Sequence, residues 1–152
     1  DWTREDGSTA SLNVYALPVE AERFAGPDIA ASMAALALPD SALTLAVVAL
    51  FARGRTSIRN VPNLRLKETD RMAALETELR KLGAQVETTE TDLLIDPPAR
   101  VTPCRIATYD DHRMAMSFAV AGLVVEGIVI QDPDCVRKTF PGFFDELRHL
   151  SA

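Results

Sequence analysis

Three polar segments of the chain have the residue types that bind and transform small anions. The first covers residues 63–71 (NLRLKETDR) and runs into a predicted helix, whose free N–H groups and positive dipole end attract anions. Lys67 and Arg71 stand four residues apart, so helical geometry would place them on one face. A structural interpretation stays open beside this one: Glu68 pairs with Arg71, and the segment only caps the helix.

The second segment, residues 109–116 (YDDHRMAM), puts two acids, a histidine and an arginine directly ahead of an apolar stretch. Its charged side chains would lie at the rim of the core, where burial can shift pKa values. Capping is again the structural alternative: Asp110 or Asp111 serves as the N-cap, and Arg113 is merely exposed.

The third segment, residues 134–141 (DCVRKTFP), is expected to bring Lys138 to the start of a helix. A lysine at a helix start is a common arrangement for binding phosphate. Cys135 lies in the same segment, but no partner base is evident in the sequence. We therefore interpret Cys135 as a small buried side chain rather than a nucleophile.

Hydrophobic periodicity predicts strands and helices that would carry these segments. The predicted strands cover residues 9–17, 56–59, 85–88, 93–95 and 127–130. The predicted helices cover residues 41–50, 69–82, 111–123 and 140–150, while the alanine-rich stretch 30–38 is ambiguous. Asp40 is expected to cap the first helix, and Gly83 to end the second.

The chain also repeats itself at a spacing of 71 residues. Residues that correspond at this spacing are similar in character or in place, namely Asp40 with Asp111, Ile58 with Val129, Lys67 with Lys138, and Met72 with Phe143. These matches indicate a duplication, with approximate units 1–82 and 83–152. Related polar residues would converge on one site if a rotation relates the two units.

Composition excludes several classes of protein. The chain has 152 residues, 47% of them hydrophobic, which argues against disorder. Its apolar stretches are shorter than the ~20 residues that span a bilayer, and no secretory leader is recognisable, so we expect a soluble, cytoplasmic protein without a membrane partner. A net charge of −6 argues against nucleic acid as a partner. Residues 53–71 alone carry +4, which suits a small anionic ligand.

The cysteines and histidines do not form a recognisable metal site. Two cysteines without a CxxC pair and two histidines give neither a disulfide framework nor zinc-ligand spacing. The glycine-rich signatures of nucleotide binding and the nucleophile elbow are missing as well. The sequence therefore predicts no metal site and no common nucleotide-binding site.

Four separated motifs resemble, in order and spacing, the closing part of the 5-enolpyruvylshikimate-3-phosphate synthase family. They are Pro39-Asp40 ahead of an apolar helix, residues 63–71, residues 109–116, and residues 138–141 (KTFP). The resemblance runs from about residue 39 to residue 150. It implies an α/β (α+β) fold made of the repeated βαβαββ units of this family's inside-out α/β barrel, with two units present here.

The resemblance also implies a reaction. Members of the family transfer the enolpyruvyl group of phosphoenolpyruvate to the 5-hydroxyl of shikimate 3-phosphate, release phosphate, and use no metal or organic cofactor. By this resemblance Asp40 accepts the proton of the shikimate hydroxyl, and Asn63 and Lys67 contact the same substrate. Glyphosate inhibits enzymes of this kind.

The remaining roles concern phosphoenolpyruvate. By the same resemblance Arg71 and Arg113 bind its carboxylate, where planar guanidinium groups give bidentate contacts. Lys138 is implied to contact the phosphate side. Glu68 is implied to protonate the methylene carbon, and His112 to tune that network.

The complete family enzyme has two domains of three such units each, with the substrates between them. This chain is expected to be part of the C-terminal domain, and the partner it needs is the missing N-terminal part of the enzyme. We therefore expect weak ligand affinity and no useful turnover from the chain alone. Two alternatives stay open: a related transferase acting on UDP-N-acetylglucosamine, or a non-catalytic module for anion binding or assembly.

Overall fold

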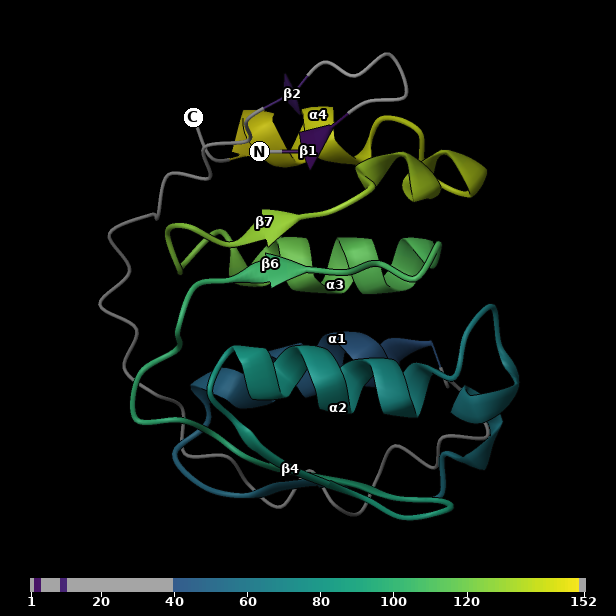
Figure 1. Ribbon diagram of the computed structural model, residues 1–152, viewed down its shortest axis with the longest axis vertical. Helices are drawn as coiled ribbons and strands as arrows, with labels where there is room; N and C mark the ends of the chain where they lie inside the picture. Colours follow the sequence, from purple (N-terminus) through teal and green to yellow (C-terminus); the bar gives the residue numbers. More distant parts are fainter. Residues whose placement is uncertain (1, 4–8, 11–39, 151–152) are drawn as a thin grey trace. The chain divides into compact units, whose positions relative to one another are not determined.

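A computed structural model describes residues 2–3, 9–10 and 40–150 of the chain (Figure 1). The described residues form two compact units: residues 40–102 make one, and residues 103–150 with two short N-terminal strands make the other. The predicted strand 9–17 is described only at its first two residues, and the stretch 30–38 lies outside the described residues.

The unit of residues 40–102 is an antiparallel sheet covered by two helices. Its strands β3 (Thr56–Ile58), β5 (Leu93–Asp96) and β4 (Gln85–Thr88) lie in the order β3-β5-β4. Figure 1 shows α1 (Ser41–Val48) and α2 (Arg71–Lys81) on the same side of this sheet. Apolar side chains fill the layer between helices and strands, and the fully buried ones include Leu43, Leu50, Leu75, Leu79, Leu93 and Ile95.

The structure confirms the predicted strands 85–88 and 93–95 and pairs them as an antiparallel hairpin. Thr88 of β4 lies opposite Leu93 of β5, and β5 also pairs with β3, where Thr56 lies opposite Ile95. Strand β5 is therefore the central strand of the sheet, paired with β4 in the hairpin and with β3 on its other side. The repeat boundary expected near residue 82 stays a prediction.

The end of α2 follows the sequence prediction closely. Gly83 has a φ of +99°, and its N–H donates to the carbonyl of Arg80 at 3.0 Å. The N–H of Ala84 donates to the carbonyl of Leu79 at 3.1 Å. These two bonds are the Schellman motif, which satisfies carbonyl groups that the helix end would leave unpaired.

Replacing Gly83 by alanine is expected to lower the free energy of unfolding by about 1–2 kcal/mol, because a Cβ disfavours the left-handed conformation. The new methyl group would also lie 3.4 Å from the Cβ of Pro98. Urea unfolding followed by circular dichroism measures the effect. Gly54→Ala is the matched control, since a Cβ there meets nothing within 4 Å. Equal effects of the two substitutions would contradict the assignment.

The unit of residues 103–150 is built around α3 (His112–Ala121). The short strands β6 (Arg105–Ile106) and β7 (Val129–Ile130) form a parallel pair. A 3₁₀ helix, η4 (Pro133–Lys138), packs on α3, and α4 (Phe143–Leu150) follows. Buried side chains of this unit include Ile106, Met114, Phe118, Ile130, Val136 and Leu147. The N-terminal strands β1 (Trp2–Thr3) and β2 (Thr9–Ala10) pair antiparallel.

Several elements of this unit differ from the prediction, among them β7, which covers only two residues of the predicted strand 127–130. The strand β6 was not predicted, because two residues show no periodicity and become a strand only by pairing with β7. Helix α4 begins at Phe143 rather than at Phe140. Phe140 precedes Pro141, and a residue before proline avoids the helical conformation. The chain makes a turn there instead, in which the N–H of Phe143 donates to the carbonyl of Phe140.

The spacing of 71 residues also appears in the positions of several elements. Helices α1 and α3 begin at Ser41 and His112, and the 3₁₀ helices η3 (Pro62–Leu66) and η4 begin at Pro62 and Pro133. In each pair the second residue follows the first by the spacing seen in the sequence. That these stretches belong to two complete βαβαββ units remains a prediction.

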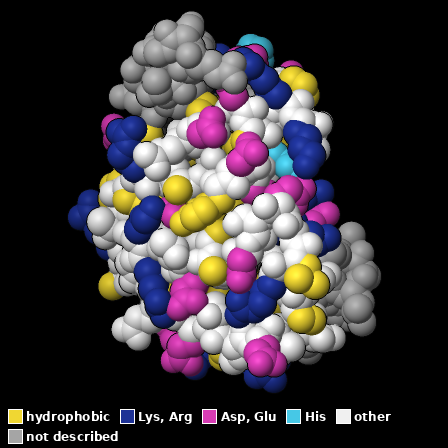
Figure 2. Space-filling view, turned by 45° about the vertical axis from the view of Figure 1, so that its right-hand side comes forward, with side chains coloured by type: hydrophobic (Ala, Val, Ile, Leu, Met, Phe, Trp, Pro, Cys, Tyr) yellow, Lys and Arg dark blue, Asp and Glu magenta, His cyan; other side chains and the backbone are white. Residues whose placement is uncertain are grey.

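One face of the molecule (Figure 2) carries charges of both signs, with apolar side chains between them. On the face drawn in Figure 2, lysine and arginine side chains are interspersed with aspartate and glutamate side chains. Among the described residues, none of the helices has both the length and the apolar character needed to cross a membrane.

Candidate active site

Arg71 is the centre of the polar cluster in the unit of residues 40–102. It is the first residue of α2, and only 1% of its side chain is exposed. Its Nη1 donates to Oδ1 of Asp40 at 2.9 Å, and its Nη2 donates to Oε2 of Glu68 at 2.9 Å. One buried guanidinium group thus brings together the two carboxylates to which the family resemblance assigns the roles of base and acid.

Helix packing and one cap place these three side chains. Asp70 caps α2 by accepting a hydrogen bond from the N–H of Ala73 at 3.0 Å, so Arg71 stands directly after the cap. The structural interpretation is therefore confirmed in both parts: the segment caps α2, and Glu68 pairs with Arg71. Asp40 occupies the N-cap position of α1, but its side chain makes no capping bond. It contacts Arg71 instead, because α1 packs against α2.

Lys67 and Asn63 belong to the loop that leads to Arg71. Lys67 follows η3 in an extended conformation and is exposed. The expected helical face shared by Lys67 and Arg71 is wrong, because α2 begins only at Arg71. Asn63 is half-buried, and its Oδ1 is buried without a hydrogen bond from the described part of the chain. A buried amide oxygen of this kind favours a site where a ligand donates a hydrogen bond.

The segment of residues 109–116 has its own constrained geometry in the other unit. Asp111 is fully buried and caps α3, accepting a hydrogen bond from the N–H of Arg113 at 2.9 Å. The structure thereby decides between the two capping acids. His112 is 4% exposed and Arg113 is half-buried.

Two left-handed residues precede that cap. Tyr109 and Asp110 have φ values of 56° and 55°, a conformation that non-glycine residues rarely adopt. The turn is closed by a hydrogen bond from the N–H of Asp111 to the carbonyl of Thr108 at 2.9 Å. Such strained backbone is often found at functional sites. No residue type in the sequence indicated this conformation, since neither residue is glycine.

Lys138 is exposed at the end of η4, which packs on α3. The expectation that Lys138 stands at a helix start is wrong, because α4 begins only at Phe143. After Lys138 the chain turns, with the N–H groups of Thr139 and Phe140 both donating to the carbonyl of Val136. Whether the side chains of the two units meet at one site stays a prediction.

Cys135 is half-buried in η4. Burial raises the pKa of its thiol to about 11, although a hydrogen bond with Thr108 acts in the opposite direction. Three nearby acids, Asp132, Asp110 and Asp111, add to the rise. A thiol with a raised pKa is a poor nucleophile at neutral pH, which agrees with its interpretation as a small side chain.

Cys135 is therefore expected to react slowly with iodoacetamide at pH 7.5. Its thiolate fraction should be about a hundredfold below that of a thiol with the ordinary pKa of 9.0. Peptide mapping by mass spectrometry distinguishes Cys135 from Cys104, and the urea-unfolded chain is the control. Equal labelling of Cys135 in the native and unfolded chain would contradict the expectation.

The basic stretch of residues 53–71 is less cationic than its composition suggests. Three of its arginines form ion pairs with acids, namely Arg55 with Asp96 and Glu87, Arg65 with Asp70, and Arg71 with Asp40 and Glu68. Lys67 is an exposed basic residue, and it directly precedes Glu68 of the Arg71 cluster in the sequence. The described residues contain no group of three or more histidine, cysteine or acidic side chains arranged to hold a metal ion.

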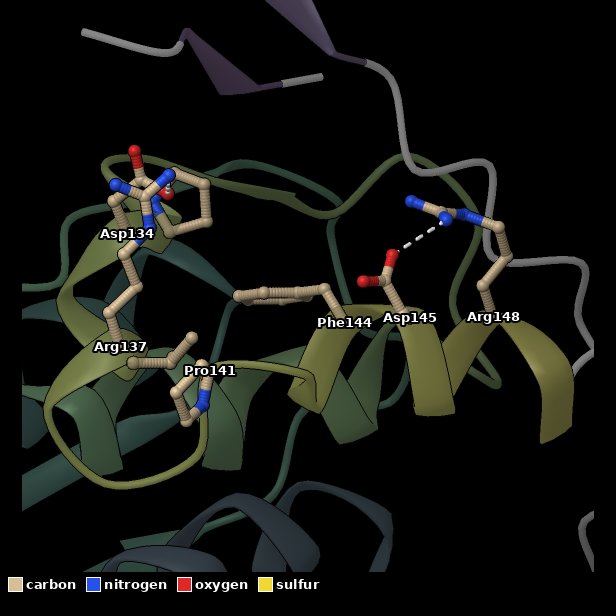
Figure 3. A pocket seen from close by; sticks show the side chains of 8 residues that line it. Asp134, Arg137, Pro141, Phe144, Asp145 and Arg148 are labelled. Atoms are coloured by element: carbon tan, nitrogen blue, oxygen red, sulfur yellow. Dashed lines mark hydrogen bonds and ion pairs between the residues drawn. The ribbon is translucent and has the colours of Figure 1, made fainter.

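A pocket of about 150 Å³ lies between η4 and α4 (Figure 3). Its walls include Phe144 and Pro141, and its two arginines are paired with acids: Arg137 with Asp134, and Arg148 with Asp145. None of the site residues expected from the sequence lines it. It is also smaller than the ~300 Å³ typical of ligand pockets. We therefore place the candidate site at the Arg71 cluster and not in this pocket.

Comparisons with known proteins show which family this chain resembles. The EPSP synthase (3-phosphoshikimate 1-carboxyvinyltransferase) family matches residues 12–147. The 3-phosphoshikimate 1-carboxyvinyltransferase of Aliivibrio salmonicida is 56% identical over 115 residues, which are 76% of this chain and 27% of the relative. That of Vibrio cholerae is 54% identical over 114 residues, with 75% and 27% covered. The chain therefore spans about a quarter of the length of these relatives.

The structural comparison leads to the same family. An EPSP synthase structure from Acinetobacter baumannii has a TM-score of 0.65 and 30% identity, over 72% of this chain and 26% of that one. This likeness confirms the expected α/β fold. Because the family match covers most of the chain, the chain belongs to the EPSP synthase (3-phosphoshikimate 1-carboxyvinyltransferase) family.

Proposed function

We propose that this chain is part of an enzyme that transfers the enolpyruvyl group of phosphoenolpyruvate to the 5-hydroxyl of shikimate 3-phosphate. The observation that carries the proposal is the contact of Arg71 with Asp40 and Glu68 in a chain that belongs to this family. The remainder of the enzyme, about three quarters of the relatives' length, supplies the other part of the site.

The two carboxylates suit an addition followed by an elimination, which needs both a base and an acid. Asp40 would accept the proton of the 5-hydroxyl, and Glu68, in its protonated form, would donate its proton to the methylene carbon. In the elimination that releases phosphate, Glu68 would take a proton back from the methyl group. Arg71 holds both at 2.9 Å, so neither carboxylate has to be ordered when substrate arrives. His112 would tune the network around Glu68.

The cations and the amide suit the charges and hydroxyls of the substrates. Arg71 and Arg113 would bind the carboxylate of phosphoenolpyruvate, and Lys138 its phosphate. Asn63 and Lys67 would contact shikimate 3-phosphate, and the buried Oδ1 of Asn63 would accept a hydrogen bond from one of its hydroxyl groups. Because the Arg71 guanidinium already contacts two acids, a bound carboxylate must share or displace one of them.

A chimaera tests the proposal. This chain replaces the matching segment of the Aliivibrio salmonicida relative, and phosphate release is measured with both substrates. We expect turnover that requires phosphoenolpyruvate and shikimate 3-phosphate together and that glyphosate inhibits. The isolated chain should release no phosphate at ordinary enzyme rates.

Three outcomes contradict the proposal. A folded chimaera without turnover would show that these residues do not support the reaction. Turnover with UDP-N-acetylglucosamine in place of shikimate 3-phosphate would favour the related transferase. Binding of shikimate 3-phosphate and glyphosate without mutual enhancement and without turnover would favour a non-catalytic anion-binding module.

A further inference from the structure

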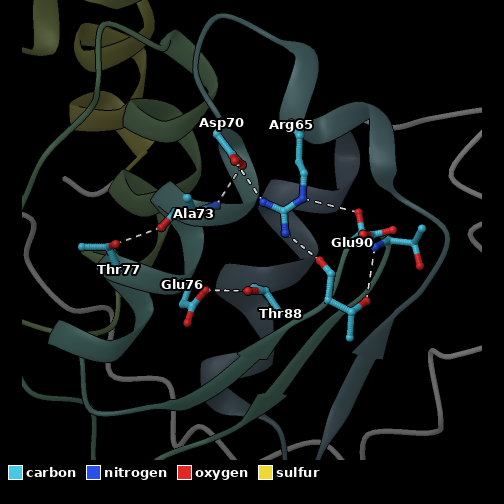
Figure 4. A network of polar contacts seen from close by, with 9 residues as sticks. Arg65, Asp70, Ala73, Glu76, Thr77, Thr88 and Glu90 are labelled. Carbon is cyan, nitrogen blue, oxygen red and sulfur yellow. Dashed lines mark hydrogen bonds and ion pairs between the residues drawn. The ribbon is translucent and has the colours of Figure 1, made fainter.

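Arg65 connects the loop of residues 60–70 to the turn of the β4–β5 hairpin, and all three of its guanidinium nitrogens take part (Figure 4). Its Nη2 donates to the carbonyl of Thr89 at 2.6 Å, and its Nε donates to the carbonyl of Glu90 at 3.4 Å. Its Nη1 donates to Oδ2 of Asp70 at 2.9 Å. About a third of the side chain is exposed. The sequence singled out this segment but gave Arg65 no role.

The hairpin turn of residues 89–92 is itself ordered by hydrogen bonds. The N–H of Thr89 donates to the carbonyl of Asp92 at 2.9 Å, and Oγ1 of Thr89 accepts from the N–H of Asp92 at 2.9 Å. Oγ1 of Thr89 also accepts from the N–H of Thr91 at 3.2 Å. The turn is therefore a preformed surface of backbone carbonyls, on which another segment can dock.

The loop docks on this turn at its beginning as well. The N–H of Val61 donates to the carbonyl of Thr91 at 2.7 Å, and the N–H of Asn60 donates to Oδ1 of Asp92 at 3.0 Å. That bond from Asn60, together with one from Thr91, lowers the pKa of Asp92, so its carboxylate stays charged at neutral pH. The loop is thus fixed at residues 60–61 and again at Arg65.

The Asp70 contact extends this connection to the Arg71 cluster. One oxygen of Asp70 accepts from Arg65, and the other accepts from the N–H of Ala73 and caps α2. The next residue is Arg71, which contacts Asp40 and Glu68. A continuous series of hydrogen bonds therefore runs from the hairpin turn through Arg65 and Asp70 to the helix that begins with Arg71.

We propose that Arg65 is a positioning residue, which fixes the loop bearing Asn63, Lys67 and Glu68 by clamping it to the hairpin turn and to Asp70. The inference rests on the proposed function of that loop. The role assigned to Arg65 is positioning, because its guanidinium group bonds the hairpin turn on one side and Asp70 on the other. Arginine suits this role better than lysine, because its planar guanidinium group presents several donors in fixed directions, whereas lysine carries a single ammonium group.

The first test uses the 152-residue chain and needs no substrate. In Arg65→Ala, amide hydrogen exchange of peptides covering residues 60–66 should become about tenfold faster or more, because the loop opens without the whole unit unfolding. Peptides covering α1 should exchange as before. Arg55→Ala is the matched control: it removes an arginine that bonds Asp96 in the same unit and should leave residues 60–66 unchanged.

The second test uses the chimaera and separates positioning from folding. Arg65→Ala should raise the KM for shikimate 3-phosphate about tenfold, because the loop no longer presents its side chains in one geometry. Loss of folded protein alone would lower the apparent kcat and leave KM where it was. Arg65→Lys should lie between wild type and Arg65→Ala, and Arg55→Ala should match wild type.

Unchanged exchange of residues 60–66 in Arg65→Ala, relative to Arg55→Ala, would overturn the inference whatever the kinetics are. Faster exchange with an unchanged KM would overturn the positioning role. If Arg65→Ala does not fold, Arg65→Lys decides by the same two measurements. An inactive wild-type chimaera would count against the proposed function only, since the exchange experiment still decides whether Arg65 clamps the loop.

Discussion

Replacing Arg71 by alanine is expected to lower the free energy of unfolding by about 3 kcal/mol, because it breaks a buried ion-pair cluster. The arginine side chain is 1% exposed, whereas those of Asp40 and Glu68 are 37% and 30% exposed. The substitution therefore leaves an internal space and two carboxylates that repel each other without the cation between them. Urea unfolding followed by circular dichroism measures the loss.

Arg55→Ala is the control for this prediction. Arg55 also contacts two acids, Asp96 and Glu87, but its side chain is 47% exposed. Exposed ion pairs contribute about 0–1 kcal/mol, so this variant should be close to wild type. Similar losses for the two arginines would mean that burial does not set the strength of the Arg71 cluster.

Replacing Asp40 by asparagine is expected to lower kcat of the chimaera by about 10²–10⁴-fold, the usual contribution of a general base. Asparagine can still accept the hydrogen bond that Arg71 now donates to Asp40 at 2.9 Å, so the local structure should persist. What it loses is the ability to take a proton from the 5-hydroxyl. KM for phosphoenolpyruvate should change little, because Arg71 keeps its place. Initial rates of phosphate release measure both constants.

Two further variants make this prediction specific. Glu68→Gln should lower kcat to a comparable extent, since glutamine cannot protonate the methylene carbon. Asp145→Asn is the control: its side chain is 70% exposed on α4 and bonds Arg148, so the rate should stay at the wild-type value. A wild-type kcat for Asp40→Asn, with the thermal midpoint unchanged, would remove Asp40 from the mechanism.

Local signals in the sequence predicted most of the elements that the structure describes. Alternating and helical periodicity gave β3, the β4–β5 hairpin and the extents of α1 and α2 to within a few residues. Gly83 correctly indicated where α2 ends, because few other residues adopt the left-handed conformation that it has there. The signals failed where a structure depends on a distant partner, as in β6, which exists only beside β7.

The candidate site shows even more clearly that local sequence signals do not reveal contacts with distant residues. The motif of residues 63–71 identified Glu68 and Arg71 as chemically interesting, but their partners are far along the chain. Asp40 is 31 residues from Arg71, and the carbonyl groups that hold Arg65 belong to residues 24 and 25 positions away. No periodicity links such positions. Arg65 and Asp70 consequently looked like ordinary charged residues, the first in a loop and the second at the start of the predicted helix 69–82.

The sequence by itself determined the family, the element types and the chemical identity of the candidate residues, because caps, turns and periodicity are local properties of the chain. Only the tertiary structure decided that Asp40 binds Arg71 rather than capping its own helix, and that Lys67 does not share a helical face with Arg71. The packing of α1 against α2 buries a guanidinium group between them. A buried cation needs acidic partners, and in this fold the partners are Asp40 and Glu68.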